Sequence, residues 1–76
     1  MPSLNQLNIN ERGKVISIEG GKGLHQKLHL HGIFVGSIVE IISNTGPLII
    51  EVDRNVISIG KKMALKITVE KINGKS

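Results

Sequence analysis

The sequence predicts a small, mainly β protein in which five short strands wrap into a barrel. Apolar and polar residues alternate along most of the 76 residues, which is the period of a strand with one buried face. Clusters of Gly, Asn and Pro separate these runs and mark tight turns. A closed barrel would pair every strand edge. The length allows one domain, and we expect a core over about residues 4–72 and a frayed tail at 73–76.

The first strand is predicted at residues 14–19, where the alternation places Ile16 and Ile18 on one face. Three glycines follow within the next four residues, Gly20–Gly23, and this composition predicts a loop, because glycine tolerates backbone angles that other residues avoid. The loop therefore ends the first strand.

A short helix is predicted at residues 24–32. Leu24 and Leu28 are four residues apart, so both lie on one helix face. Gly32 stands where a left-handed residue commonly ends a helix. The helix thus follows the first strand directly.

Four more alternating runs predict the remaining strands, at residues 37–43, 48–53, 56–59 and 66–72. The composition of residues 44–47, Asn-Thr-Gly-Pro, predicts a turn. A two-residue hairpin break is predicted at Arg54-Asn55, because Asn tolerates a positive φ. Residues 60–65 predict one helical turn before the last strand. Val39 and Ile41 are expected to face the core, with Ile38 and Ile42 on the outer face.

Composition excludes several classes of function. The chain has no cysteine, which excludes disulfides and thiolate chemistry. No apolar run approaches the roughly 20 residues of a membrane span, and the N-terminus lacks a signal-peptide pattern. The net charge of +4 raises nucleic acid as a partner, but Phe34 is the only Phe, Tyr or Trp. Because single-strand binders stack bases on aromatic rings, we expect no nucleic-acid binding.

No catalytic constellation is visible. The six acidic residues are scattered and are expected to point mostly outward from strands. The glycine loop lacks the Gly-Lys-Ser/Thr ending of a phosphate cradle. We therefore expect neither an enzyme nor a cofactor.

The three histidines are candidate metal ligands. His25 and His29 are four residues apart, a spacing that places both rings on one helix face. No Asp or Glu lies between Gly20 and Val39 to complete a ligand set. We expect no metal site, with His25 and His29 solvated and His31 in a half-buried apolar slot.

Outward apolar residues leave two interpretations open. Ile38, Ile42 and Ile49 are predicted to lie opposite the core-facing residues. They would form a protein-binding patch if exposed, or a second buried layer if coiling of so small a sheet buries both faces.

The order of short motifs resembles that of the FeoA family over roughly residues 4–70. The matching residues are Leu4, Leu7, Gly13, the glycine loop, Lys27-Leu28, Gly32, Ile33-Phe34-Val35-Gly36, Gly46-Pro47, Ala64 and Ile67-Thr68-Val69. The family comprises small cytoplasmic SH3-like proteins associated with bacterial ferrous-iron uptake. The chain departs from the family pattern at Lys27, His31, Val35 and Gly60, where Arg, Leu or Met, Pro and Arg respectively are usual.

The resemblance implies a non-enzymatic accessory protein that binds the cytoplasmic, GTP-binding portion of a FeoB-type ferrous-iron transporter and meets the membrane only through that partner. The helix and its flanks are the expected contact surface, comprising Leu24, Lys27, Leu28, Leu30, Phe34, Gly21 and Gly23. Two alternatives remain: a free-standing relative of the SH3-like domain of metal-dependent transcription repressors, or a small nucleic-acid-binding barrel.

Overall fold

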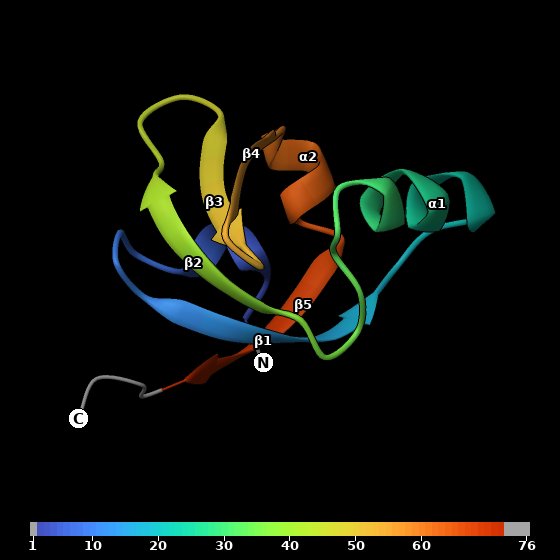
Figure 1. The fold of residues 1–76 in the computed structure, drawn as a ribbon, viewed down its shortest axis with the longest axis horizontal. Coiled ribbons are helices and arrows are strands. Elements are labelled where there is room, and N and C mark those ends of the chain that lie inside the picture. Colours follow the sequence, from blue (N-terminus) through green and yellow to red (C-terminus); the bar gives the residue numbers. More distant parts are fainter. Residues whose placement is uncertain (1, 73–76) are drawn as a thin grey trace.

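The computed structural model describes residues 2–72 and shows five strands, two short α-helices and one 3-10 turn (Figure 1). In chain order the elements are η1 (Leu4–Gln6), β1 (Arg12–Ile18), α1 (Lys22–Leu30), β2 (Ile38–Ser43), β3 (Leu48–Val52), β4 (Asn55–Ile59), α2 (Lys61–Ala64) and β5 (Ile67–Ile72). The predicted fold class is confirmed, including the helix after the first strand and the helical turn before the last. The tail predicted at 73–76 lies outside the described residues.

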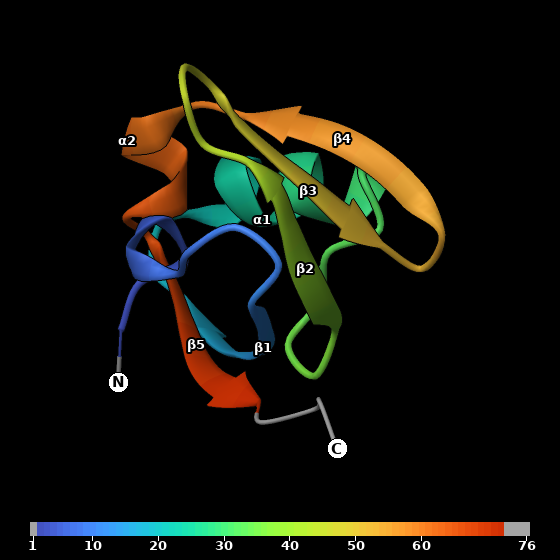
Figure 2. The ribbon, with the colours of Figure 1, turned by 90° about the vertical axis from the view of Figure 1, so that its left-hand side faces the viewer.

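The strands form one antiparallel sheet in the order β4-β3-β2-β1-β5. Within residues 2–72 no ladder joins β4 to β5, so the predicted barrel is curled but open at this point. η1 and α2 contact each other beside β5, and they cover the interior at the opening (Figure 2). Leu4 of η1 and Ala64 of α2 are fully buried there. The 3-10 turn was not predicted from the sequence.

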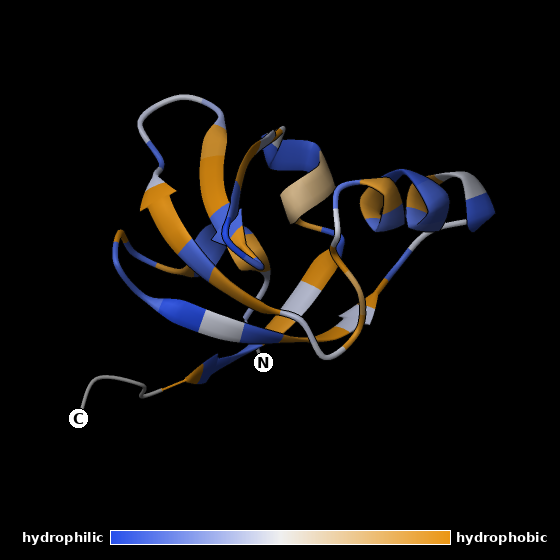
Figure 3. Ribbon diagram, in the orientation of Figure 1, coloured by the Kyte–Doolittle hydropathy of each residue, from blue (hydrophilic) through white to orange (hydrophobic). Residues whose placement is uncertain are grey.

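The interior is entirely apolar, because no polar or charged residue among those described is buried. β2 and β3 are mostly apolar strands, whereas β1 begins with polar residues (Figure 3). Val39 and Ile41 are buried and Ile38 is exposed, as the alternation predicted. Alternation therefore places one side of β2 in the core and leaves apolar side chains on the other.

The predicted inward face of β1 is wrong. Val15 and Ile18 are buried, whereas Ile16 is only half-buried. The ladder with β5 shifts register between Val15 and Ser17, which inserts one extra residue and reverses which side chains face inward beyond it. A strict period of two cannot reveal such a bulge, because the extra residue leaves the apolar composition unchanged.

The hairpin between β3 and β4 turns one residue earlier than predicted. Asp53 and Arg54 form the loop with φ of 52° and 68°, and Asn55 already pairs with Val52. Two consecutive positive φ angles match the twist of a two-residue hairpin. The register that keeps Val52 in the core fixes the turn here, although Asn suits a positive φ better than Arg does.

Candidate partner-binding site

The candidate surface is built on α1, which projects from the side of the curled sheet (Figure 1). Gly20 has a φ of 131°, which turns the chain out of β1 before the helix begins. Leu28 is fully buried, and the partly buried Leu24 packs against the core beside it. Gly32, with a φ of 85°, ends the helix as predicted. One leucine face thus anchors α1 and leaves the opposite face to solvent.

The structure separates the predicted contact residues into two groups. Lys27, Leu30 and Phe34 are exposed, as are Gly21 and Gly23. Leu28 belongs to the core and cannot offer its side chain to a partner, which corrects that prediction. Leu24 lies between the two groups, because it is partly buried against the core.

The predicted environment of His31 is also wrong. His31 is exposed, and the buried residue of this segment is Ile33. The chain reverses at Gly32, and the backbone N–H of Ile33 donates to the carbonyl of Leu28 at 2.9 Å. The reversal therefore points Ile33 into the core and leaves His31 outside.

Four exposed apolar side chains occur along the chain between the end of α1 and the start of β2. We call Leu30, Phe34, Val35 and Ile38 the α1–β2 apolar surface, and their exposed fractions are 89%, 48%, 62% and 43%. On the outer face of β2, Ile42 is also exposed, while Ile49 of β3 is half-buried. Of the two interpretations left open by the sequence, the structure therefore favours an exposed outer face.

Backbone hydrogen bonds hold this segment against β1. The N–H of Gly36 donates to the carbonyl of Val15 at 2.7 Å, and the N–H of Val15 donates to the carbonyl of Ser37 at 2.8 Å. The N–H of Phe34 donates to Oγ of Ser37 at 2.9 Å. Because the backbone is tied on both sides of Val35, Phe34 and Val35 are presented from a fixed loop.

A row of rings leads from α1 to this surface. The rings of His29 and Phe34 stack with centroids 4.6 Å apart, and the ring of His25 meets that of His29 edge-on at 6.3 Å. A surface hollow of about 490 Å³ lies over Gly20, Gly21, Lys22, His25, Gln26 and His29. A second hollow of about 390 Å³ includes Phe34 and Ile38. Two recesses thus lie beside the apolar surface.

His25 and His29 are the residues of α1 suited to hold a metal ion. Within residues 2–72 no group of three or more His, Cys, Asp or Glu side chains is arranged to hold one. A pair of imidazoles leaves the remaining coordination positions to water or to a partner. The expectation that this chain binds no metal stays a prediction.

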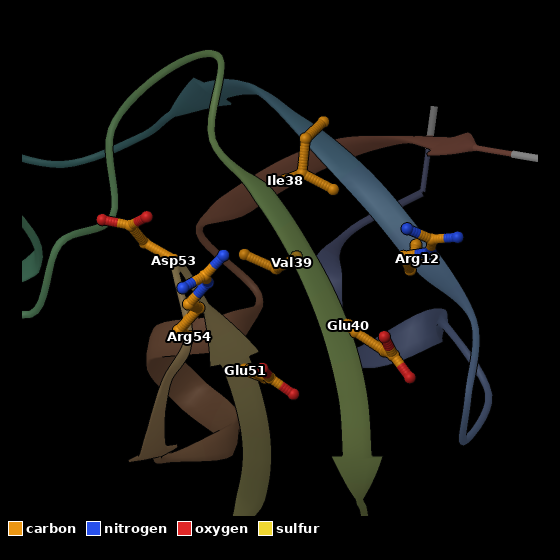
Figure 4. A pocket seen from close by; sticks show the side chains of 7 residues that line it. All are labelled: Arg12, Ile38, Val39, Glu40, Glu51, Asp53 and Arg54. Carbon is orange, nitrogen blue, oxygen red and sulfur yellow. The ribbon is translucent and has the colours of Figure 1, made fainter. Parts of the chain in front are cut away.

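A charged hollow of about 140 Å³ lies over β1, β2 and β3 and was missed from the sequence (Figure 4). Cross-strand register places Arg12 beside Glu40 and Glu40 beside Glu51, so the acidic residues are less scattered than predicted. Asp53 and Arg54 reach the hollow from the hairpin. Its charged lining consists of the carboxylates of Glu40, Glu51 and Asp53 and the guanidinium groups of Arg12 and Arg54.

No helix formed by residues 2–72 has both the length and the apolar character that spanning a membrane requires.

Comparison with known proteins places the chain among iron-transport relatives. The FeoA domain family model matches residues 3–71. A candidate Fe(2+) transport protein A of Methanocaldococcus jannaschii is 42% identical over 57 residues, which are 74% of this chain and 70% of that protein. The crystal structure of an iron uptake regulatory protein (FeoA) is 31% identical with a TM-score of 0.88, covering 93% of this chain and 96% of that one.

Other solved structures share the fold. Iron(II) transport protein A of Clostridium thermocellum is 25% identical with a TM-score of 0.88, covering 95% of this chain and 46% of that one. IdeR of T. acidophilum is 21% identical with a TM-score of 0.86, and the match covers 92% of this chain and 33% of that protein. At that identity the second likeness concerns the SH3-like fold alone.

Proposed function

Because this chain belongs to the FeoA family, we propose that it is an accessory protein of ferrous-iron transport that binds the cytoplasmic part of a FeoB-type transporter. The names of its relatives, which refer to iron(II) transport and iron uptake, support the process. The α1–β2 apolar surface supports action through binding. Removing its exposed apolar side chains from water under a partner surface lowers the free energy.

Leu30 is the observation on which the proposal chiefly depends. Its side chain is 89% exposed at the end of a helix that Leu28 anchors in the core. Full burial of a leucine side chain is worth roughly 1.5–3 kcal/mol. A helix that is ordered before binding also loses little conformational entropy when the partner arrives. Leu30 is therefore the expected centre of the contact.

Charge is expected to guide the approach. Lys22 and Lys27 lie on the exposed side of α1, and the described helix has no acidic residue in its first turn. Lys14 of β1 stands opposite Ile38 of β2 in the ladder, at the other side of the apolar surface. Basic residues around an apolar centre suit a partner surface with an apolar pocket and acidic rim.

In this proposal the protein acts by binding and not by catalysis. A bound accessory protein shifts the conformational equilibrium of a transporter only by as much as it prefers one conformation. That preference requires a contact surface and no chemical step. Among the described residues the interior is wholly apolar, which is consistent with this role.

The test is a titration of the isotope-labelled chain with the purified cytoplasmic domain of the transporter, followed by backbone-amide NMR. We expect the largest shifts at Leu30, Phe34 and Val35. Leu30→Ala should weaken binding about tenfold, since the lost burial is worth about 1.4 kcal/mol. Leu65→Ala is the matched control, because Leu65 is 58% exposed outside this surface.

Three results would count against the proposal. Unchanged spectra at micromolar transporter domain would exclude the partner. Equal losses in Leu30→Ala and Leu65→Ala would exclude the surface. Salt-dependent shifts produced instead by an oligonucleotide, or shifts produced only by a metal-dependent repressor, would favour one of the two alternatives considered from the sequence.

A further inference from the structure

The carboxylate of Asp53 lies beside the α1–β2 apolar surface without a partner of its own. Within residues 2–72, no hydrogen bond or ion pair reaches it. The adjacent Arg54 does not neutralise it, because the carboxylate points away from that guanidinium and toward the loop that follows α1 (Figure 4). Asp53 is therefore an unpaired negative charge in a chain whose net charge is +4.

The second hollow, of about 390 Å³, places this charge next to apolar groups. Its lining is Gly32, Phe34, Ser37, Ile38, Val52 and Asp53. The ladder brings Val52 opposite Val39, so Asp53, the next residue of the hairpin, comes beside Ile38. Phe34 reaches the hollow from the loop that is hydrogen-bonded to β1. The hollow thus has aromatic and aliphatic walls, and Asp53 is the one charged residue of this lining.

Such a lining suits the side chain of arginine. The methylene groups of an arginine lie along apolar walls while its charged end reaches a carboxylate. Its planar guanidinium also stacks on aromatic rings and pairs with carboxylates through two parallel hydrogen bonds. Phe34 supplies a ring that is held by stacking on His29 and is still 48% exposed. A lysine ammonium is a more strongly hydrated point charge and gains less from the ring.

We propose that this hollow binds an arginine side chain of the protein partner. In taking that partner to be the cytoplasmic part of the transporter, the inference rests on the proposed function. The arginine would lie beside the contact centred on Leu30, because Phe34 and Ile38 belong both to the hollow and to the α1–β2 apolar surface. The lysines around that surface and this one carboxylate attract opposite charges, which fixes the orientation of the partner.

Asp53→Asn removes the charge and keeps the hairpin. Asp53 has a φ of 52° in a two-residue turn, and Asn tolerates a positive φ as well as Asp does. Glu19→Gln is the matched control, because it removes the same charge from an exposed position after β1 that lines none of the three hollows. We expect both variants to show the circular dichroism of the wild-type fold.

A first titration tests the hollow without the transporter. N-acetylarginine amide is added to the isotope-labelled chain, and we expect saturable amide shifts at Phe34, Ser37 and Asp53 at millimolar ligand. The citrulline analogue has the same shape without the charge and should bind about fivefold more weakly. The lysine analogue keeps the charge without the planar group and should bind about twofold more weakly.

The two variants complete this titration. Asp53→Asn should weaken binding of the arginine amide about fivefold, whereas Glu19→Gln should leave it unchanged. Equal binding of the arginine and citrulline analogues, or wild-type binding by Asp53→Asn, would overturn the site. Equal binding of the lysine analogue would overturn the assignment to arginine.

A second titration uses the purified cytoplasmic domain of the transporter. We expect Asp53→Asn to weaken its binding about fivefold and Glu19→Gln to leave it unchanged. If Leu30→Ala weakens binding and Asp53→Asn does not, the arginine contact is refuted and the proposed function stands. If the domain does not bind while the arginine amide behaves as expected, the proposed function is refuted, the arginine site stands, and the transporter is excluded as the source of the arginine.

Discussion

At the scale of single residues, neighbours on one short segment have opposite roles. Leu28 and Leu30 are two residues apart on α1, which places them on different faces of the helix. One is fully buried and the other almost fully exposed. Ile33 then returns to the core after the reversal at Gly32. Exposed apolar and buried core residues thus alternate along one short segment.

Two glycines at the start of α1 are expected to respond oppositely to substitution by alanine. Gly20→Ala should destabilise the fold by about 1–3 kcal/mol, because φ is 131° and the new Cβ would lie 2.6 Å from Cδ2 of Leu24. Gly23→Ala should stabilise it by up to about 1 kcal/mol, since the site is helical and open. Urea denaturation with unchanged slope measures both. Equal effects would contradict the described turn.

At the scale of elements, one ion pair joins the approach to β1 to the end of β5. Nζ of Lys71 lies 2.5 Å from Oε2 of Glu11. The other carboxylate oxygen, Oε1, accepts a hydrogen bond from the N–H of Asn8 at 2.7 Å. The hydrogen bond from Lys71, and then that from Asn8, hold the pKa of Glu11 below its ordinary value of 4.5. Glu11 thereby links two segments that are distant in sequence.

This lowered pKa predicts a pH dependence of stability. The unfolded chain binds the proton more tightly, so the contribution of Glu11 is fully present above about pH 4.5 and is lost as the pH falls through the lower folded-state pKa. We expect the difference in Tm between wild type and Glu11→Gln to shrink below pH 4.5. Lys71→Gln should remove the same increment, and a constant difference from pH 7 to pH 3 would contradict the link.

At the scale of the whole molecule, an open sheet is completed by segments that are not strands. The N–H of Val69 in β5 donates to the carbonyl of Pro2, and Ser3 bridges to Thr68. These bonds fix η1 beside β5, where Leu4 and Leu7 enter the core. Within residues 2–72, η1 and α2 cover the interior at the opening without forming a ladder with β4. The opening of the sheet is thus covered by segments from near the two ends of the sequence order, η1 and α2.

Leu4 should therefore matter as much as a residue of the sheet. A domain of 76 residues has a stability of roughly 4–11 kcal/mol. Leu4→Ala should cost about 2–5 kcal/mol, which lowers Tm by at least about 8 °C. The exposed Leu65→Ala should cost less than about 0.5 kcal/mol. Similar melting temperatures for the two variants would contradict the packing of η1.

The sequence by itself determined the fold class, the order of elements and most core positions. Period-two alternation and glycine-rich breaks are local signals, and burying one face of each strand needs no knowledge of its neighbours. The helix end at Gly32 followed in the same way. Motif order also identified the family, because spacing along the chain survives changes of individual residues.

Only the tertiary structure decided the features that depend on pairing between segments. The bulge after Val15, the turn at Asp53-Arg54 and the cluster of Arg12, Glu40 and Glu51 all follow from register. The burial of Ile33 in place of His31 follows from the direction of the chain after Gly32. Register and direction are set by contacts between residues far apart in sequence. A local sequence pattern does not reveal these long-range contacts.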